Sequence, residues 1–502
     1  VTLIDNNGAP SGEKNIVLYN PPLVDRVQGI RRGVVLEAQR IGAEILKKGA
    51  KTILFARSRV RVELIASYIR NRLANFFTDN SRIRVESYRG GYLPNERRAI
   101  EKGLREGSIH GVVSTNALEL GIDIGGLDVS ILAGIPGSVA SAWQQAGRAG
   151  RRNTASLSVL IASSSPTDQY MIKHPEYFFS KSPESGWVDP DNIYILLDHV
   201  KCAVFEIPMK PDEQFGSDVS ELLEYLEENG VVRFTEGSYY WADRGYPAES
   251  VSLRSATAEN VVIVDVTEGR NNVIGEMDLP SAKELLFQEA VYIHRGSQYF
   301  VQELDLEDNR CYVTESTVNF YTDAIVKTDI KVLEEDEVRP YLDFSSVLGD
   351  ILVRRQVAKF KKLKYGTHEN IGYGEIHLPE DEMHTRTVVL LFPEESSAGA
   401  YLQSLNEEFR EIVLSKVGTL LINVAPFILL CDRRDISVAE RVRDPHFHEF
   451  ALYVYEMYPG GIGLAEGFIK NIQLMIEAAA ELVIECPCSR GCPSCIGPEG
   501  GS

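Results

Sequence analysis

The stretch STNALELGIDIGGLDVSILAGIPGSVASAWQQAGRAGRR, residues 114–152, decides the fold of this chain. A buried strand delivers Ser114 and Thr115 to a loop, and a second apolar run leads to two arginines, Arg148 and Arg151. The glycines beside them let the backbone lie close to a ligand, and planar guanidinium groups match the oxygens of a transferring phosphate. The pattern therefore favours a site at which arginines stabilise charge during phosphoryl transfer.

The segments around this stretch alternate between strand and helix patterns. KTILFA at 51–56 has the continuous apolar character of a buried strand, and VELIASYIRNRLANFF at 62–77 has helical periodicity. Similar strand patterns occur in IRVESY, HGVVST, VSILAG and SLSVLIAS. Short buried strands separated by helices form a parallel sheet covered on both faces. We therefore expect an α/β domain over residues 1–182.

The alternation stops after Pro183. Two helical segments follow, DPDNIYILLDHVKCAVFEI and VSELLEYLEENG, and then two short β runs. This order predicts a winged-helix domain over residues 183–258, with a small helical connector as the alternative. Strand patterns dominate after that, and helical patterns return near the end, which predicts a mixed α+β C-terminal region over residues 259–502, formed by one domain or two.

Four of the seven cysteines crowd into the last seventeen residues, in the run ECPCSRGCPSC. Four thiolates within ten residues can close a tetrahedron around zinc, and the intervening Pro and Gly residues supply tight turns. An iron–sulfur cluster and free or redox-active thiols are the alternatives. The predicted ligands are Cys486, Cys488, Cys492 and Cys495.

The composition is that of a globular chain, with 44% hydrophobic and 25% charged residues. A formal net charge of −20 argues against indiscriminate coating of nucleic acid, because phosphate binding needs clustered Lys and Arg. The basic segment at 354–364 is one candidate patch, and a solvated face is the alternative. We find no signal-peptide pattern and no stretch of eighteen apolar residues, so we expect a cytoplasmic protein without membrane contact.

Residues 114–152 resemble the second, RecA-like motor lobe of superfamily 2 helicases. In these enzymes a Q-x-x-G-R-x-G-R element carries the arginine fingers, and the chain fills this pattern without a departure. The resemblance implies that Arg148, Arg151 and Gln144 act in catalysis and that Gly147 lies beside the nucleotide. A lone G-R-x-G-R can be a surface loop, but here three further motifs accompany it in the expected order.

These further motifs are STNALELGIDI, which is similar to motif V, TILFARSRVRVE, which is similar to motif IV, and SYRGGYLPNERR, which resembles the next backbone-contacting loop. The resemblance implies that Gly121 and Asp123 lie near the nucleotide. It also implies contacts with nucleic acid for five residues, which are Arg57, Ser58, Arg89, Thr115 and Asn116.

The 502 residues contain no G-x-x-x-x-G-K-[ST] phosphate cradle. The arginine element therefore needs a first motor lobe to hold ATP and Mg²⁺, and the chain alone should not hydrolyse ATP. Its opening VTLIDNNGAPSGEKNIVLYNPP has the character of a connector after such a lobe, so we expect a truncated or separately produced half. A literal D-E-x-H at 381–384 lies downstream of the arginine element and is interpreted as coincidence.

APFILLCDRRDI and YVYEMYPGGIGLAEG resemble a family of bacterial and fungal helicases in which a zinc-binding domain follows the motor. The whole chain resembles the C-terminal portion of the mitomycin repair factor A (YprA-type) family. The resemblance implies 3′–5′ unwinding of DNA in repair, with single-stranded or duplex DNA, the first motor lobe and a repair nuclease as partners. The alternatives are a zinc-stabilised module that binds DNA or a partner without catalysis and, less favoured, a metal-dependent nuclease.

Overall fold

The computed structural model of the chain describes most of its residues. These are 12–25, 30–74, 83–120, 124–150, 155–180, 186–216, 219–249, 251, 260–486, 488 and 492–497.

The first described region contains a six-stranded parallel sheet. Its strands in spatial order are β1 (Lys14–Tyr19), β8 (Ser156–Ile161), β7 (Val129–Ala133), β4 (Thr52–Ala56), β6 (Gly111–Ser114) and β5 (Val85–Tyr88). The strands β4, β5, β6 and β7 are buried along their whole length, as their apolar runs predicted. A small hairpin, β2 (Leu23–Asp25) and β3 (Ile30–Arg31), stands beside this sheet.

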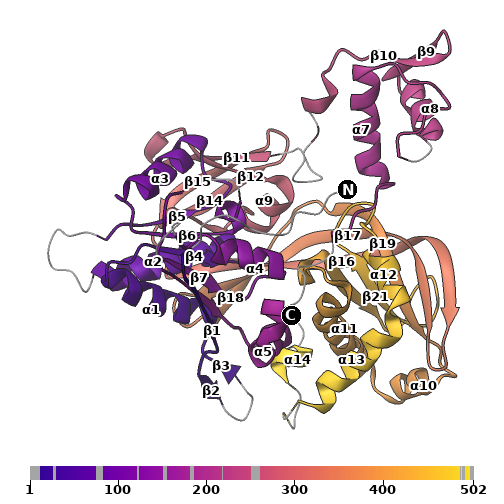
Figure 1. Ribbon diagram of the computed structural model, residues 1–502. Helices are drawn as coiled ribbons and strands as arrows, with labels where there is room; N and C mark the ends of the chain where they lie inside the picture. Colours follow the sequence, from indigo (N-terminus) through magenta and orange to yellow (C-terminus); the bar gives the residue numbers. More distant parts are fainter. Residues whose placement is uncertain are drawn as a thin grey trace.

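Helices cover both faces of this sheet (Figure 1). One apolar core lies under α1 (Val34–Lys47) and α2 (Arg59–Ala74). The other lies under α3 (Pro94–Glu106), α4 (Val139–Ala146), α5 (Pro166–Lys173) and α6 (Pro175–Ser180). The α/β domain with both faces covered is confirmed.

A separate small unit follows and projects from the body of the molecule (Figure 1). It contains α7 (Ile193–Glu206), α8 (Ser220–Glu228), β9 (Val232–Thr235), β10 (Ser238–Trp241) and the short η2 (Pro247–Glu249). Asn192 caps α7, and the β9–β10 hairpin turns at Glu236 and Gly237, which both adopt positive φ. Two helices and a β hairpin around one apolar core form the predicted winged helix.

The remaining described residues contain two sheets. The first is five-stranded, with α9 (Leu279–Leu285) and the short η3 (Thr267–Gly269) beside it. Its strands in spatial order are β12 (Asn272–Asp278), β11 (Asn260–Asp265), β15 (Arg310–Ser316), β14 (Ser297–Asp305) and β13 (Val291–His294). The second is built on a long hairpin, and its strands are β16 (Phe320–Pro340), β17 (Ser345–Lys364), β18 (Asn370–Glu375), β19 (Asp381–Phe392), β20 (Ile436–Arg441) and β21 (Phe450–Glu456).

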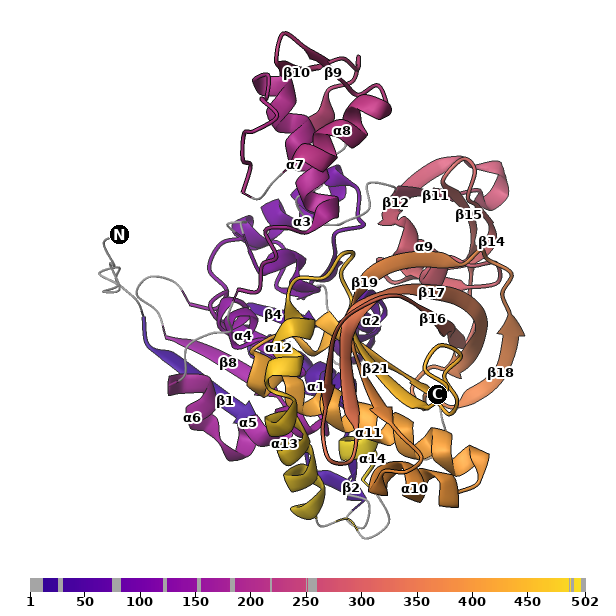
Figure 2. The same ribbon diagram turned by 90° about the vertical axis from the view of Figure 1, so that its right-hand side faces the viewer.

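The second sheet arches over a group of helices (Figure 2). Apolar residues of β17, β19 and β21 form one core with three of these helices. The helices of this part are α10 (Ser397–Ser404), α11 (Glu407–Leu429), η4 (Arg433–Asp435), α12 (Leu464–Lys470), α13 (Ile472–Ile484) and α14 (Pro493–Ile496). Sheet and helices together make the predicted mixed α+β region.

The helix α11 is apolar enough to need comment. By length and composition it is a candidate membrane span, with a mean hydropathy of 1.9 in its most apolar window. A core helix of a folded domain passes the same test, so this finding does not contradict the expectation of no membrane contact. In α11, 44% of the window is buried, and Leu421, Ala425 and Leu429 belong to the core beneath the arching sheet. Its apolar character follows from its position in the protein interior.

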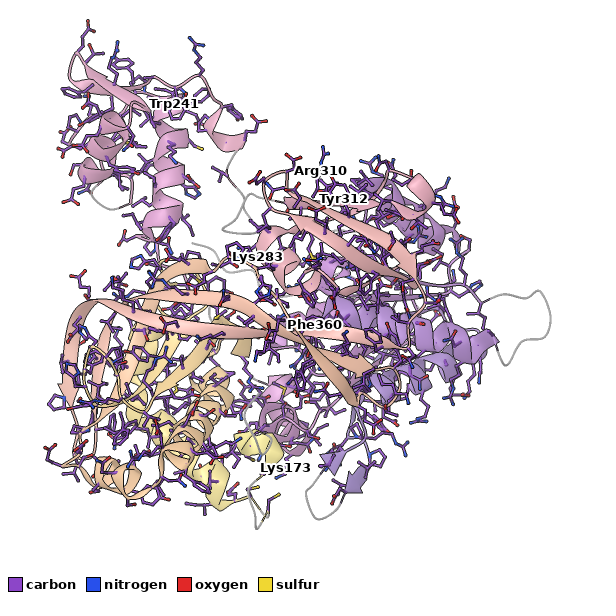
Figure 3. The ribbon with its side chains drawn as sticks, turned by 180° about the vertical axis from the view of Figure 1, so that it is seen from behind. Lys173, Trp241, Lys283, Arg310, Tyr312 and Phe360 are labelled. Atoms are coloured by element: carbon purple, nitrogen blue, oxygen red, sulfur yellow. The ribbon has the colours of Figure 1, made fainter. Side chains whose placement is uncertain are left out.

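Lys283 and Phe360 lie where the five-stranded sheet meets the long hairpin (Figure 3). Lys283 of α9 is nearly buried, and its Nζ donates to the carboxylate of Asp381 at the start of β19. Phe360 of β17 packs against Phe287, with ring centroids 4.9 Å apart. Asp381 therefore has a structural partner, which agrees with the interpretation of the D-E-x-H sequence as coincidence.

The surroundings of Arg89 contradict the role predicted for it. It was expected to contact nucleic acid, but its side chain is only 2% exposed and forms an ion pair with buried Glu63, with Nε and Oε1 3.2 Å apart. Its Nη2 donates to the Tyr292 hydroxyl and to the Ile293 carbonyl, both at 2.8 Å. The motif suggested the wrong role, because a strand far along the chain covers this loop.

Other contacts strengthen the same junction between the α/β domain and the five-stranded sheet. Arg59 pairs with Asp278 at 2.7 Å, and Arg295 pairs with Glu96 at 2.9 Å. The backbone N–H of Glu276 also donates to the carbonyl of Gly91 at 3.0 Å. The junction combines buried charge with backbone pairing, so we expect the two parts to move together.

Replacing Arg89 tests this structural role. Arg89→Ala should destabilise the chain by about 3–5 kcal/mol, because it leaves the Glu63 carboxylate buried without a counter-charge. Chemical denaturation measures this, with Arg98→Ala, an exposed position on α3, as the control. Unchanged stability together with lost DNA binding would restore the original prediction.

Candidate functional site

Two of the predicted nucleic-acid residues follow the strand β4. Arg57 comes directly after it, and its Nη2 donates to the Ile135 carbonyl while Asp168 Oδ1 lies 3.6 Å away. Ser58 precedes α2, and its Oγ accepts the backbone N–H of Arg61 at 3.2 Å. Arg57 remains 38% exposed, so its guanidinium can still reach a ligand.

The turn after β6 carries the next two predicted residues. Thr115 accepts the backbone N–H of Ala117 and so caps the short η1 (Asn116–Leu118). Asn116 is exposed at the start of this turn. Because β4 and β6 are adjacent and parallel, their carboxyl ends bring Arg57 and Asn116 to the same edge of the sheet.

A cleft of about 530 Å³ opens at this edge. One wall belongs to the α/β domain, and the opposite wall is formed by the end of α11 and by η4. Ser58, Thr115 and Arg89 are not part of its lining. Residues that line it include Arg57, Asn116, Gly137, Asp168, Phe427 and Arg433.

The basic segment at 354–364 is not brought to the cleft. It forms the second half of β17. Arg354 pairs with Glu382 at 2.8 Å and Arg355 pairs with Glu284 at 2.9 Å. These contacts favour the alternative that the segment is a solvated, partly ion-paired face.

The arginine element begins on α4, and Glu119 contacts its described part through two groups. Arg148 donates to the Glu119 carbonyl from Nε at 2.9 Å and from Nη2 at 2.6 Å. The Glu119 carboxylate accepts from Gln145 Nε2 at 2.9 Å and from Ser141 Oγ at 2.8 Å. The turn that begins at Asn116 therefore also positions the arginine.

The other members of the element have different surroundings. Gln144 is exposed on α4, and Gly147 follows the helix. Gly150 has a φ of 103°, and a side chain there would also meet Ser156, so the position suits glycine. Arg151, Gly121 and Asp123 lie outside the described residues.

Several residues of this site were missed by the sequence analysis. Glu119 lies inside the quoted motif, but its central role as acceptor was not recognised. Gln145 was overlooked beside Gln144, although a buried glutamine on α4 needs a partner. Asp168 belongs to no quoted motif, and Arg433 lies in APFILLCDRRDI, which was quoted for the family resemblance without a role for this residue. Only the folded chain brings both to the cleft.

The C-terminal cysteines gather as predicted. The Sγ atoms of Cys486, Cys492 and Cys495 all lie within 4.8 Å of one another. Tetrahedral zinc with Zn–S bonds of about 2.3 Å needs sulfurs roughly 3.8 Å apart, so small adjustments suffice. Cys488 lies near Cys486 and Cys492 but is not among the three grouped sulfurs, so it stays the predicted fourth ligand.

One thiol of this cluster, Cys492, has a lowered pKa, whereas burial raises the pKa of Cys488 and of Cys495. Burial raises the pKa of the Cys492 thiol, but backbone N–H groups of Cys495 and Ser494 outweigh this and lower it overall. Donors of this kind stabilise a thiolate, the form that binds zinc. Asn423 of α11 donates to the Cys495 carbonyl at 2.9 Å, which ties the cysteine loop to α11.

Comparison with known proteins gives a family match within each of three parts of the chain. Residues 37–153 match the family model of the helicase conserved C-terminal domain. Residues 188–256 match the winged helix domain of ATP-dependent helicase HRQ1, and residues 417–496 match the MrfA Zn-binding domain. A RecA-like second motor lobe, a winged helix and a zinc-binding domain together define a superfamily 2 helicase.

Sequence similarity to individual helicases shows which family of helicases the chain resembles most clearly. The chain is 48% identical over 499 residues to the ATP-dependent helicase YprA of Bacillus subtilis, covering 99% of this chain and 65% of that protein. It is 30% identical to the ATP-dependent helicase HRQ1 of Saccharomyces cerevisiae, covering 99% of this chain and 47% of that protein. It therefore spans between about half and two thirds of these relatives' length.

A solved structure, the DUF1998 helicase MrfA bound to DNA, superposes with a TM-score of 0.76 at 48% identity. The match covers 99% of this chain and 66% of that one. The chain belongs to the mitomycin repair factor A (YprA-type) family of superfamily 2 DNA helicases and corresponds to the C-terminal portion of its members.

The cysteine site gives a direct test. Cys492→Ser should release metal and lower the melting temperature of the C-terminal region, because three thiolates hold zinc less tightly than four. Metal analysis should find about one zinc per chain in the unmodified protein. Cys202→Ser, in α7 of the winged helix, is the matched control. Full zinc content in the Cys492 variant would contradict the assignment.

Proposed function

We propose that this chain supplies the second motor lobe and the accessory domains of a 3′–5′ DNA helicase that acts in DNA repair. One observation carries the proposal. The turn after β6 presents Asn116 to the cleft and, three residues later, holds Arg148 through Glu119. A nucleic-acid contact and a nucleotide contact on one short turn are what a motor needs to convert ATP hydrolysis into movement.

In this proposal the chain does not hydrolyse ATP alone. A first motor lobe would hold ATP and Mg²⁺, and Arg148 and Arg151 would reach the transferring phosphate across the gap between the lobes. Gln144, Gly147, Gly121 and Asp123 would complete the nucleotide side. Glu119 keeps the Arg148 guanidinium oriented before the nucleotide arrives, which lowers the cost of organising the site.

The nucleic-acid side would grip the DNA backbone. Arg57, Ser58, Thr115 and Asn116 offer one guanidinium and short polar groups at one sheet edge, which suits phosphates rather than base edges. Binding should therefore show little sequence preference and a strong dependence on salt.

The same proposal includes the domain boundaries, the polarity, the biological role, the partners and the location. The domain boundaries remain 1–182, 183–258 and 259–502. The 3′–5′ polarity, the role in repair and a partner nuclease rest on the family resemblance, whereas the cytoplasmic location rests on the sequence pattern alone. The alternative is a module that binds DNA or a partner without taking part in catalysis, and it is favoured only by the missing phosphate cradle.

Reconstitution separates the two functions. The chain alone should show no DNA-stimulated ATPase, because it lacks groups to hold the β- and γ-phosphates. Mixing it with a separately produced first motor lobe of the same protein should restore turnover. Tight DNA binding with continued ATPase silence in the mixture would favour the non-catalytic module.

The arginine element has its own test in the complete protein. Arg151→Ala should lower kcat for ATP by about a thousandfold or more, because an arginine finger stabilises charge in the transition state. DNA affinity should stay nearly unchanged, and Lys102→Ala, at an exposed position on α3 outside the quoted motifs, is the control. Retained turnover would remove the arginine-finger assignment.

A further inference from the structure

The cleft has a second basic wall that no motif of the motor lobe contains. The short helix η4 follows α11 in the zinc-binding domain, and its Arg433 and Arg434 line the cleft together with Arg57. Arg57 belongs to the motor lobe, so two domains contribute guanidinium groups to one space.

The carboxylates of the cleft are already engaged. Asp168 lies beside Arg57 and also accepts the backbone N–H of Ser163 at 2.6 Å. Asp432 accepts from Arg434 Nη2 at 2.8 Å. Glu119 accepts from Gln145 and Ser141, as described above. Among the described residues, Arg433 has no hydrogen bond or ion pair to compensate its charge.

Arg433 is therefore a cation in an unfavourable position when the cleft is empty of ligand. Burial lowers the pKa of its guanidinium, the charge of Arg57 lowers it further, and Asp168 compensates only in part. An anion between Arg57 and Arg433 would relieve both the repulsion and the missing hydrogen bonds.

Contacts on both sides of Arg433 fix its position at the cleft. The neighbouring Asp432 presses against Gly137 of the motor lobe, where a Cβ atom would lie 2.1 Å from its carboxyl group. Burial raises the pKa of Asp432, but hydrogen bonds from Arg434 outweigh this and keep it ionised. Upstream, α11 is tied to the cysteine loop through Asn423. The zinc-binding domain thus holds η4 against the motor lobe.

We propose that Arg433 and Arg57 together bind a backbone phosphate of one DNA strand, so that the zinc-binding domain forms half of the DNA site. This inference rests on the proposed function, because it assumes that the motor lobe binds DNA at the cleft. Two guanidinium groups can donate several charge-assisted hydrogen bonds to one phosphodiester.

The test is the salt dependence of binding to a short, fluorescently labelled oligo-thymidylate, measured on the zinc-loaded chain. Arg433→Gln should weaken binding and reduce the slope of log K against log salt concentration by about 0.7, the value for one lost phosphate contact on a single strand. Arg433→Lys should keep most of the slope, because it keeps the charge. Lys470→Gln, an exposed charge on α12 outside the cleft, should change neither.

A double-mutant cycle shows whether both arginines hold the same phosphate. The loss from Arg57→Gln with Arg433→Gln should be smaller than the sum of the two single losses. If Arg57→Gln weakens binding but Arg433→Gln leaves affinity and slope unchanged, this inference is overturned and the proposed function stands. If the unmodified chain fails to bind the oligonucleotide, both are overturned.

Discussion

The geometry of the site depends on one residue with two acceptor groups. The Glu119 carbonyl receives the Arg148 guanidinium, and its carboxylate receives Gln145 and Ser141 of α4. These bonds fix the arginine element against the turn after β6. Since Asn116 of the same turn faces the cleft, a shift of the turn would alter both ends together. Such an element can carry coupling between two ligands if it has two arrangements, one favoured by each.

The other parts of the molecule extend this lobe in two directions. The buried Glu63–Arg89 pair attaches the five-stranded sheet, and η4 with α11 attaches the zinc-binding domain beside the cleft. The winged helix is anchored at its base, where Trp187 donates to the Leu429 carbonyl at 2.7 Å and Asn192 donates to the Pro459 carbonyl at 2.7 Å. Of these contacts, only those of α11 and η4 lie at the cleft itself.

The features that could be predicted from the sequence are those that depend on residues close together in the chain. Uninterrupted apolar runs such as TILFA gave the buried strands, and the clustered cysteines gave the metal site, because both depend on neighbours in the chain. The prediction for Arg89 was wrong because its hydrogen-bond partner, Tyr292, lies 203 positions further along the chain. Arg433 was missed for the same reason, since only the packing of η4 against the motor lobe gives it a function.

The most direct measurement is the effect of a non-hydrolysable ATP analogue on DNA affinity in the complete protein, with and without Glu119→Ala. If the turn connects the two ligand sites, the analogue should change the Kd for single-stranded DNA in the unmodified protein, and this change should largely disappear in the variant. An equal effect of the analogue on both proteins would show that coupling bypasses the turn and would contradict the account.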